Sequence, residues 1–161
     1  MTEIKYKPIG FIHSPFKEPE GTPIQPIAGQ GIEGTVEVFQ EYLEGLKDLD
    51  GFSHIILIYH LHLSTEFSLK VIPFMDDQSH GVFSTRAPKR PNPIGISVVQ
   101  LVKMAGNILH IKDLDILEGT PLLDIKPYVP EIDMREVQKK GWLEKNVSKI
   151  SKFRDDGRFI K

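Results

Sequence analysis

Short apolar runs, rich in β-branched and aromatic residues, recur along the chain and are separated by turn residues. The runs cover residues 7–13, 34–38, 53–63, 81–85, 95–104 and 108–114. Glycine and proline are spread between them rather than gathered in one linker. Many short strands at this spacing are typical of all-β proteins. The pattern therefore predicts an antiparallel β-barrel or sandwich.

Two segments depart from the strand pattern and favour helices. In residues 40–49, Leu43, Leu46 and Leu49 fall roughly on one helical face, although Gly45 weakens the helix. The second segment lies near the C-terminus, where Asp133 is a candidate N-cap.

The C-terminal segment continues this helical pattern with apolar residues at wide spacing. Val137 is expected to face inward, and after Gly141 the residues Leu143, Val147 and Ile150 keep an i, i+4, i+7 spacing. Residues 151–161 are polar, and we predict a poorly specified end there.

One glycine motif imitates a nucleotide-binding loop. Gly29, Gly31 and Gly34 satisfy the pattern G-x-G-x-x-G. That motif binds phosphate only when a strand precedes it and a helix opens at it. Here a proline-containing loop (residues 23–26) precedes the motif and a strand-like run (residues 35–39) follows it. We therefore predict a flexible loop rather than a dinucleotide site.

Composition narrows the class of protein. The chain has 161 residues, of which 40% are hydrophobic and 26% charged, a balance typical of one globular domain. It has no cysteine, which excludes disulfides and thiolate metal sites. No apolar run near the N-terminus has the length of a secretory signal, so we expect a cytoplasmic protein.

Charge is unevenly distributed along the chain. Residues 135–161 contain nine Lys and Arg against four acids, or about +5, whereas the whole chain carries −2. A basic tail on an acidic body can contact phosphates, although a solvated helix face has the same composition.

A stiff cationic segment follows the fourth apolar run. Three prolines in residues 88–93 fix the backbone repeatedly and extend the residues before them. The segment would present Arg86, Lys89, Arg90 and Asn92 with little conformational freedom. Preorganised cations and an amide suit a polar or anionic ligand.

A second polar segment spans residues 117–128. A Gly-Thr-Pro turn at Gly119 lets backbone approach a ligand closely. If the next residues are extended, Asp124 and Lys126 point to the same side. They are then either site residues or a surface ion pair of little energetic value.

Two further groups of residues carry weaker signals. Gln25 stands between prolines in a loop, and amides of this kind read purine edges well. His60 and His62 lie two positions apart, so that a carboxylate from Glu66 or Asp76 would complete a metal site. The metal site is the less favoured interpretation, because no metal-binding helical pattern accompanies the histidines.

Several strings occur together in one order. They are Pro-Ile-Gly-Phe-Ile-His-Ser-Pro-Phe at 8–16, Phe-Ser-His-Ile at 52–55, Gly-Val-Phe-Ser-Thr-Arg at 81–86, Arg-Pro-Asn-Pro-Ile-Gly at 90–95, Glu-Gly-Thr-Pro at 118–121 and Asp-Ile-Lys-Pro-Tyr at 124–128. In this combination the chain resembles the TsaA-like family, which includes the TrmO-type tRNA methyltransferases. The resemblance runs from about residue 7 to residue 130.

The resemblance implies a specific fold and reaction. It implies a mainly β protein, an antiparallel barrel with a few short peripheral helices, unlike the Rossmann-type methyltransferases. It implies S-adenosyl-L-methionine (SAM) as cofactor, a homodimer, and tRNA as partner. The reaction implied is methylation of N6 in N6-threonylcarbamoyladenosine at tRNA position 37. On this basis residues 1–134 are expected to form the SAM-binding barrel, and residues 135–161 a basic helical extension of the same domain.

The resemblance also assigns roles to residues. The cofactor contacts that carry over are Pro23, Ile24, Gln25, His62, Leu63, Arg86, Ile96, Ile116, Leu117, Glu118, Gly119 and Thr120. Candidates for contact with the substrate or RNA are Lys89, Arg90, Asn92 and Lys126. Bacterial relatives often carry a further C-terminal domain, and the basic tail of this chain is a candidate to replace its tRNA contacts.

The chemistry of methyl transfer adds candidate catalytic residues. In-line displacement from a sulfonium needs alignment and exclusion of water. Backbone carbonyls of residues 117–120 are candidate partners for the sulfonium, and Asp124, Glu118 and Tyr128 are candidates to accept the proton of the methylated nitrogen. Two other classes stay open: a SAM-binding module without catalysis, and a histidine-dependent metallohydrolase.

Overall fold

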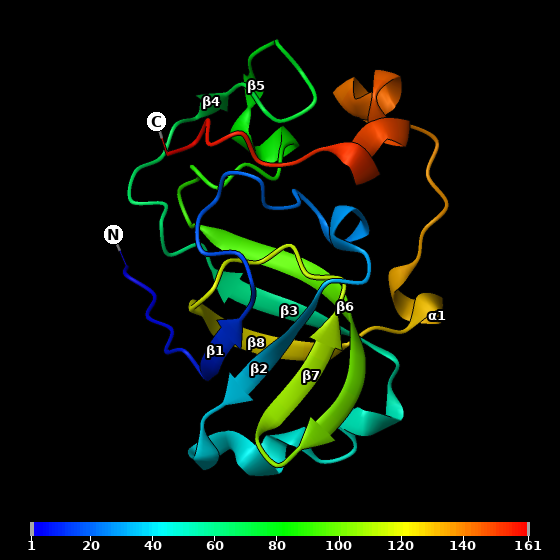
Figure 1. The fold of residues 1–161 in the computed structure, drawn as a ribbon. Coiled ribbons are helices and arrows are strands. Elements are labelled where there is room, and N and C mark those ends of the chain that lie inside the picture. Colours follow the sequence, from blue (N-terminus) through cyan, green and yellow to red (C-terminus); the bar gives the residue numbers. More distant parts are fainter. Residues whose placement is uncertain (1, 161) are drawn as a thin grey trace.

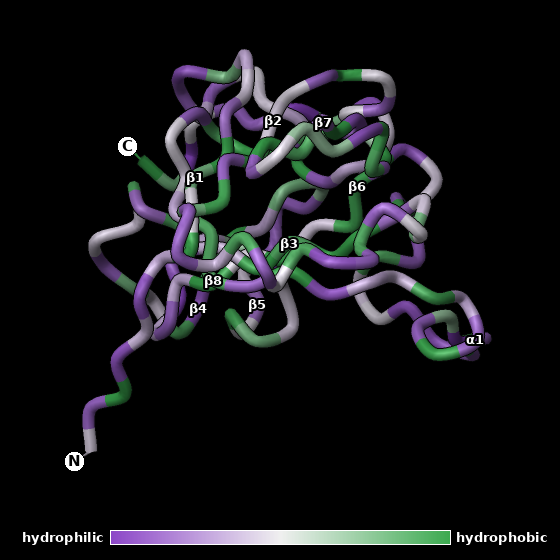
Figure 2. Tube along the Cα trace, turned by 90° about the horizontal axis from the view of Figure 1, so that it is seen from below, coloured by the Kyte–Doolittle hydropathy of each residue, from purple (hydrophilic) through white to green (hydrophobic). Residues whose placement is uncertain are grey.

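A six-stranded antiparallel barrel forms the centre of the molecule. The computed structural model describes residues 2–160. The barrel strands are β1 (Gly10–His13), β2 (Glu33–Val38), β3 (His54–His60), β6 (Ile94–Ala105), β7 (Ile108–Lys112) and β8 (Thr120–Pro127). They close in the order β1-β2-β7-β6-β3-β8, and Figure 2, seen from below, shows this ring. The predicted mainly β barrel is thus confirmed.

Side-chain alternation explains why the barrel closes around an apolar core. In β3, Ile55, Leu57 and Tyr59 are buried while the residues between them are half-buried. Successive side chains of a strand point to opposite faces, so one face of β3 fills the barrel. The interior also holds fully buried side chains from the other strands and from residues 114–116: Ile12, Val36, Val38, Val99, Leu109, Ile111, Leu114, Ile116 and Leu122.

The barrel closes through β8, which pairs with both β1 and β3. The sequence pattern did not single out this strand. Conversely, the strand predicted at residues 81–85 is wrong. Only Gly81 belongs to a strand, the short β5 (His80–Gly81), which pairs with β4 (Lys70–Val71) beside the barrel. Residues Val82–Ser84 form the 3₁₀ helix η4 instead.

The other helices are short. The segment predicted as a helix at 40–49 forms the 3₁₀ helices η2 (Gln40–Leu46) and η3 (Leu49–Gly51), which are separated at Asp48, a residue with φ of 69°. The helix η1 (Pro26–Gly29) ends where the glycine motif begins, and β2 follows it. No helix opens at the motif, so the structure confirms that it is not a dinucleotide-binding loop.

The C-terminal segment differs most from its prediction. Helix α1 covers only Pro130–Asp133, and Asp133 is its last residue rather than its N-cap. Val137 is 58% exposed and does not face inward. Two 3₁₀ helices follow, η5 (Gly141–Lys145) and η6 (Val147–Lys152).

Residues 153–160, which we call the strap, return to the barrel (Figure 1, red). Pro23 and Arg154 form an antiparallel bridge there. The prediction of a poorly specified end is therefore wrong for these residues, while Lys161 lies outside the described residues. None of the helices in residues 2–160 is long and apolar enough to cross a membrane.

Candidate cofactor and active site

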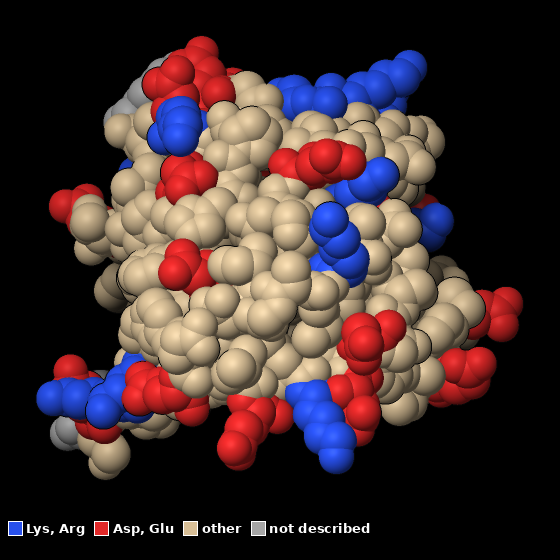
Figure 3. Space-filling model, turned by 60° about the horizontal axis from the view of Figure 1, so that its bottom comes forward, with Lys and Arg blue, Asp and Glu red and all other residues tan. Residues whose placement is uncertain are grey.

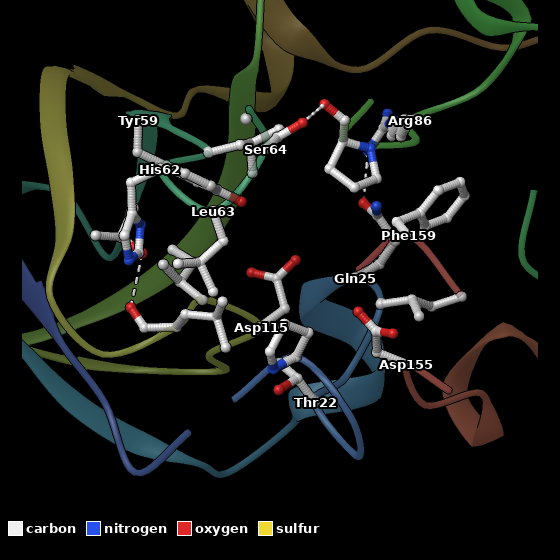
Figure 4. Close-up of a pocket in the computed structure, with 18 of the residues that line it drawn as sticks. Thr22, Gln25, Tyr59, His62, Leu63, Ser64, Arg86, Asp115, Asp155 and Phe159 are labelled. Atoms are coloured by element: carbon white, nitrogen blue, oxygen red, sulfur yellow. Dashed lines mark hydrogen bonds between the residues drawn. The ribbon is translucent and has the colours of Figure 1, made fainter. Parts of the chain in front are cut away.

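A cavity of about 270 Å³ opens at one end of the barrel (Figure 4). The ends of β3 and β6 and the loop before β8 meet there, because antiparallel strands bring these three termini to the same end. The loop at residues 19–25, the stiff segment at 86–90 and the strap supply the remaining walls. Segments far apart in the sequence thus surround one space.

A chain of hydrogen bonds links the barrel core to this cavity. Ser97 donates its hydroxyl proton to Oδ1 of Asp115 at 2.6 Å, and the hydroxyls of Tyr59 and Ser97 lie 2.8 Å apart. Because the proton of Ser97 is used on Asp115, Tyr59 is the donor to Ser97. Tyr59 and Ser97 are buried, and both Tyr59 and Asp115 line the cavity.

Burial raises the pKa of Asp115 and of Tyr59, the residues at the two ends of this series of hydrogen bonds. It raises the pKa of Asp115 to about 7, against the opposing effects of the Ser97 hydrogen bond and of Arg86. Burial, and next the charge of Asp115, raise the pKa of Tyr59, which therefore stays neutral. Asp115 is thus a carboxyl group that titrates near neutral pH at the surface of a cavity, a property typical of functional sites.

The absence of a side chain at Gly95 leaves room for the ring of Tyr59, which lines the cavity. The two residues are directly paired between β6 and β3. A Cβ atom at position 95 would lie 2.2 Å from Cε2 of Tyr59. The glycine at the end of the Pro-Asn-Pro-Ile-Gly string is therefore needed for close packing.

Arg86 and Gln25 form one wall. The Nη1 atom of Arg86 donates to Oε1 of Gln25 at 2.7 Å, across 61 positions of sequence. Arg86 has no ion-pair partner among residues 2–160. Its guanidinium group is therefore able to bind an anionic group of a ligand.

Arg90 stabilises the stiff segment from within. Its Nη1 atom donates to the carbonyl oxygens of Thr85 and Ala87, each at 3.0 Å. The hydroxyl of Ser64 donates to the carbonyl of Pro88 at 2.8 Å, which ties the segment to the residues after β3. These bonds add to the rigidity that the prolines confer.

The strap forms the wall that the sequence did not predict. The amide of Asp155 donates to the carbonyl of Thr22 at 2.7 Å, and the amide of Gly21 donates to the carbonyl of Asp155 at 2.6 Å. Phe159 packs edge-to-face on Phe74, with ring centroids 5.1 Å apart. Asp155, Phe159 and Ile160 all line the cavity.

Most of the predicted cofactor contacts come together here. The cavity is lined by Pro23, Ile24, Gln25, His62, Leu63, Arg86, Ile96, Ile116, Leu117 and Thr120. Glu118 and Gly119 do not line it. The sequence reasoning missed Tyr59, Asp115, Asp155 and Phe159. Asp115 did carry a signal, since a carboxylate between the buried residues Leu114 and Ile116 needs a structural or chemical reason.

The three predicted catalytic residues lie elsewhere. Glu118 binds Nδ1 of His13 at 2.7 Å and accepts the amide of Ser14 at 2.8 Å. Asp124 pairs with Lys126 at 2.9 Å, and the ring of Tyr128 lies against His54. None of the three lines the cavity. The geometry therefore does not support the prediction that one of them accepts a proton there.

Glu118 belongs to a surface cluster with His13 and Glu37. The Nε2 atom of His13 lies 3.1 Å from Glu37, so both ring nitrogens face carboxylates. The hydrogen bond that His13 donates to Glu118 is the largest cause of the raised pKa of His13. Burial works to raise the pKa of Glu118, but hydrogen bonds from His13 and Ser14 lower it overall. The cluster stabilises the junction of β1 and β2 with the loop before β8.

Of the predicted substrate or RNA contacts, Arg90 alone lines the cavity. Asn92 is exposed and Lys89 is half-buried, and neither lines the cavity. Lys126 pairs with Asp124 on the outer surface of β8, which agrees with the surface ion pair, one of the two alternatives that the sequence left open. The second polar segment thus contributes its first residues to the cavity and places the rest outside.

Of the two histidines considered for a metal site, His62 lines the cavity and His60 does not. Burial, and next the neighbouring His60, lower the pKa of His62. Within residues 2–160, no group of three or more His, Cys, Asp or Glu side chains is arranged to hold a metal ion.

A second hollow of about 690 Å³ adjoins the first. It shares Gln25, Arg86 and Phe159 with the cavity and extends to Phe83 and Trp142. The indole nitrogen of Trp142 donates to the carbonyl of Ser84 at 2.8 Å. Arg86 therefore faces two neighbouring spaces.

A family model identifies the barrel. The model described as the tRNA-methyltransferase O N-terminal domain matches residues 11–134. The chain belongs to the TsaA/TrmO-like family. The residues of the strap lie beyond the match, although they complete the cavity.

Known relatives of this TrmO-like chain come from archaea, bacteria and human. A Pyrococcus abyssi protein, named as a probable S-adenosyl-L-methionine-binding protein, is 67% identical over 98% of this chain and 85% of its own length. The human tRNA (adenine(37)-N6)-methyltransferase is 34% identical over 79% of this chain and 30% of its own length.

Solved TrmO structures share the fold. The crystal structure of TrmO from Pseudomonas aeruginosa matches with a TM-score of 0.73 at 36% identity, over 88% of this chain. This chain spans 63% of the length of that solved chain. The TrmO-like fold described above is thus found in experimentally determined relatives.

The residues of the cavity fit a ligand such as SAM, which has an apolar surface, a carboxylate and positive charge. The cavity volume of about 270 Å³ is slightly below the ~300–1,000 Å³ of small-molecule sites. Ile24, Ile96 and Ile116 offer apolar walls, and Arg86 offers donors to a carboxylate. Asp115 offers negative charge.

Proposed function

We propose that this chain is a SAM-dependent tRNA methyltransferase that methylates N6 of N6-threonylcarbamoyladenosine at position 37. The observation that carries the proposal is that segments which the family resemblance links to the cofactor meet at one cavity. These are the loop at 23–25, residues 62–63, Arg86, and Ile116 and Leu117 of the loop before β8 together with Thr120, the first residue of β8. The names of the P. abyssi and human relatives support the cofactor and the tRNA substrate.

The cofactor would supply the methyl group. The residues of the chain would chiefly have to hold and orient the cofactor and the substrate, and to keep water out of the site. Arg86 is placed to bind a carboxylate while Gln25 holds its guanidinium group in position. The stiff segment and the strap enclose the space, which excludes water and strengthens electrostatic interactions inside. Tyr59 and Ser97 fix the orientation of Asp115.

Contacts with RNA would come from the exposed side of the tail. The cations Lys139, Lys140, Lys149 and Lys152 are exposed there. The face in Figure 3, by contrast, intermixes acidic and basic side chains around a largely uncharged centre. We propose that the tail contacts phosphate with its outer side and that residues 135–160 belong to the same domain as the barrel. A tRNA substrate would place the protein in the cytoplasm.

We also propose a homodimer, as the resemblance implies. The outer face of β3 and β6 carries Ile56, Ile58, Ile96 and Val98 side by side in register. Ile96 is 49% exposed, and apolar surface of this kind favours association. Light scattering of the purified protein that gives the mass of one chain at micromolar concentration would contradict this part of the proposal.

The test of function is methyl transfer from labelled SAM to tRNA. The purified chain should label tRNA that carries the threonylcarbamoyl group and leave unmodified tRNA unlabelled, as followed by mass spectrometry of nucleosides. Binding of SAM without transfer would instead support a non-catalytic SAM-binding module. Transfer to a different nucleoside would overturn the proposed substrate.

Arg86→Ala tests whether the cavity is the site. We expect SAM affinity to fall by about tenfold to a hundredfold, because a charge-assisted hydrogen bond contributes ~1.5–3 kcal/mol. Lys126→Ala is the matched control, since Lys126 is a cation on the outer surface of the barrel. Wild-type SAM affinity in Arg86→Ala would place the site elsewhere.

A further inference from the structure

Asp115 is a half-buried acid without an ion-pair partner among the residues that the structure describes. It lies between two fully buried residues, and its carboxylate points into the middle of the cavity (Figure 4). It forms no ion pair with any residue in 2–160. Ser97 donates one hydrogen bond to Oδ1, and Arg86 acts on the carboxylate only from a longer distance. A charge in this position is costly unless a ligand compensates it.

The neighbouring backbone does not offer an equivalent negative group. The carbonyl of Leu117 accepts bonds from both the amide and the hydroxyl of Thr120. The carbonyl of Ile116 accepts the hydroxyl of Ser14 at 2.6 Å. The sequence had suggested the carbonyls of residues 117–120, that of Leu117 among them, as partners of a sulfonium. The Leu117 and Ile116 carbonyls are already used, and Glu118 and Gly119 do not line the cavity, so we assign the role of negative group at this end to Asp115.

We propose that Asp115 is the counter-ion that makes the cavity prefer a positively charged sulfonium ligand over the neutral thioether left after methyl transfer. The inference rests on the proposed function and assigns a residue that governs which form of the ligand binds. Two opposite charges in a water-poor site attract by several times the value in water. A neutral thioether gains nothing from the carboxylate.

The charge balance of the reaction fits this role. Transfer breaks the carbon–sulfur bond, whose electron pair stays on sulfur, and forms a carbon–nitrogen bond from the lone pair of the acceptor nitrogen. One proton leaves that nitrogen. Asp115, which no longer faces a cation, takes up one proton from the site and becomes neutral together with the thioether. Burial raises the pKa of Asp115 to about 7, which brings the titration of this carboxyl group into the neutral range.

The effects of other charged groups around the cavity must be distinguished from the effect of Asp115. His62 is neutral at pH 7 but would become positive in acid and repel a cation. Asp155 on the strap is also a carboxylate whose pKa burial raises, and it accepts the amide of Gly157 at 2.7 Å. Arg86 and Arg90 contribute guanidinium cations to the lining of the cavity, and burial keeps Tyr59 neutral.

The experiment compares the dissociation constants of SAM and S-adenosylhomocysteine by calorimetry between pH 5.5 and 7.5. The α-amino group of both ligands is mostly protonated across this range. The wild-type chain should favour SAM by about tenfold to a hundredfold at pH 7.5, and the preference should shrink toward pH 5.5. Asp115→Asn should bind both ligands about equally at every pH. His62→Gln and Asp155→Asn should keep the preference at pH 7.5.

Ser97→Ala provides a second variant that retains the carboxylate. Loss of the hydrogen bond should raise the pKa of Asp115, so the pH at which the preference disappears should move upward while the preference persists at pH 7.5 or above. An unchanged preference in Asp115→Asn would overturn the inference, as would an unchanged midpoint in Ser97→Ala if Asp115→Asn fails to fold. If wild type shows the preference but methylates no tRNA, the proposed function fails and the inference stands.

Discussion

Deletion of residues 153–161 tests whether the strap is a wall of the cavity or an arm for RNA. The deletion removes two backbone hydrogen bonds to the loop at 21–22, of 2.6 and 2.7 Å. It also removes the Phe159 ring from Phe74 and the Arg158 guanidinium, which lies 5.0 Å from the centre of the Phe74 ring. The barrel pairings themselves are untouched.

The expected magnitude follows from these contacts. Each hydrogen bond contributes ~0.5–1.5 kcal/mol, the aromatic pair ~0.5–1.5 kcal/mol and the cation–π contact ~0.5–1 kcal/mol. This energy holds the strap in place before a ligand binds. Without the strap, Asp155, Phe159 and Ile160 no longer line the cavity, and water enters. We expect SAM affinity to fall by about tenfold to a hundredfold, or ~1.4–2.8 kcal/mol.

The assay is calorimetric titration of SAM into the full-length and shortened chains, together with tRNA binding at two salt concentrations. Lys149→Ala combined with Lys152→Ala is the matched control, because both lysines are exposed and neither lines the cavity. That control should keep SAM affinity and weaken tRNA binding mainly at low salt. If the shortened chain keeps its SAM affinity but binds tRNA more weakly, the strap is not a wall of the cavity and acts instead as an arm for RNA.

Two further predictions concern stability. Gly95→Ala should lower the free energy of unfolding by about 1–3 kcal/mol, because the new methyl group would meet the Tyr59 ring; thermal unfolding should show no comparable loss for Gly45→Ala, where no atom lies within 4 Å. His13 has a raised pKa, so its stabilising effect is present below its unfolded value of 6.5 and is lost as pH rises through its folded value. Glu118 has a lowered pKa, so its own contribution is lost as pH falls. In calorimetric unfolding, the wild-type chain should therefore become less stable as pH rises, and His13→Gln should lack this fall. We expect the fall to be only about a few tenths of a kcal/mol, because the group is partly exposed.

The sequence predicted the barrel wherever strands alternate clearly. In β3 the predicted apolar run forms a strand, and the structure adds that buried and half-buried residues alternate in it from Ile55 to Tyr59. Strand β8 was missed because Pro121 and Pro127 lie within it and charged residues occupy its outer face. A strand with these features forms because β1 and β3 bind both of its edges, and a sequence pattern does not report such partners.

The candidate site was predicted where it rests on local strings and missed where it rests on distant contacts. Arg86 and Gln25 were found separately, but their hydrogen bond joins residues 61 positions apart. The strap was read as a loose end since its residues are mostly polar. Its order comes from Thr22 and Phe74, which precede it by more than 80 positions. Asp115 was passed over because its burial depends on where Leu114 and Ile116 fit into the barrel.

The family match and the cavity do not have the same bounds, and this affects how a site is transferred from relatives. The match ends at residue 134, yet Asp155, Phe159 and Ile160 line the cavity together with Ile94 and Ile96. A barrel end alone leaves such a space open to water, and an ion in it would then be screened. The electrostatic preference assigned to Asp115 therefore depends on enclosure by a segment that the family motif does not describe. The alignment with the P. abyssi protein covers 98% of this chain, so it includes most of that segment. We therefore propose that the residues after the barrel form part of the cofactor site of this chain.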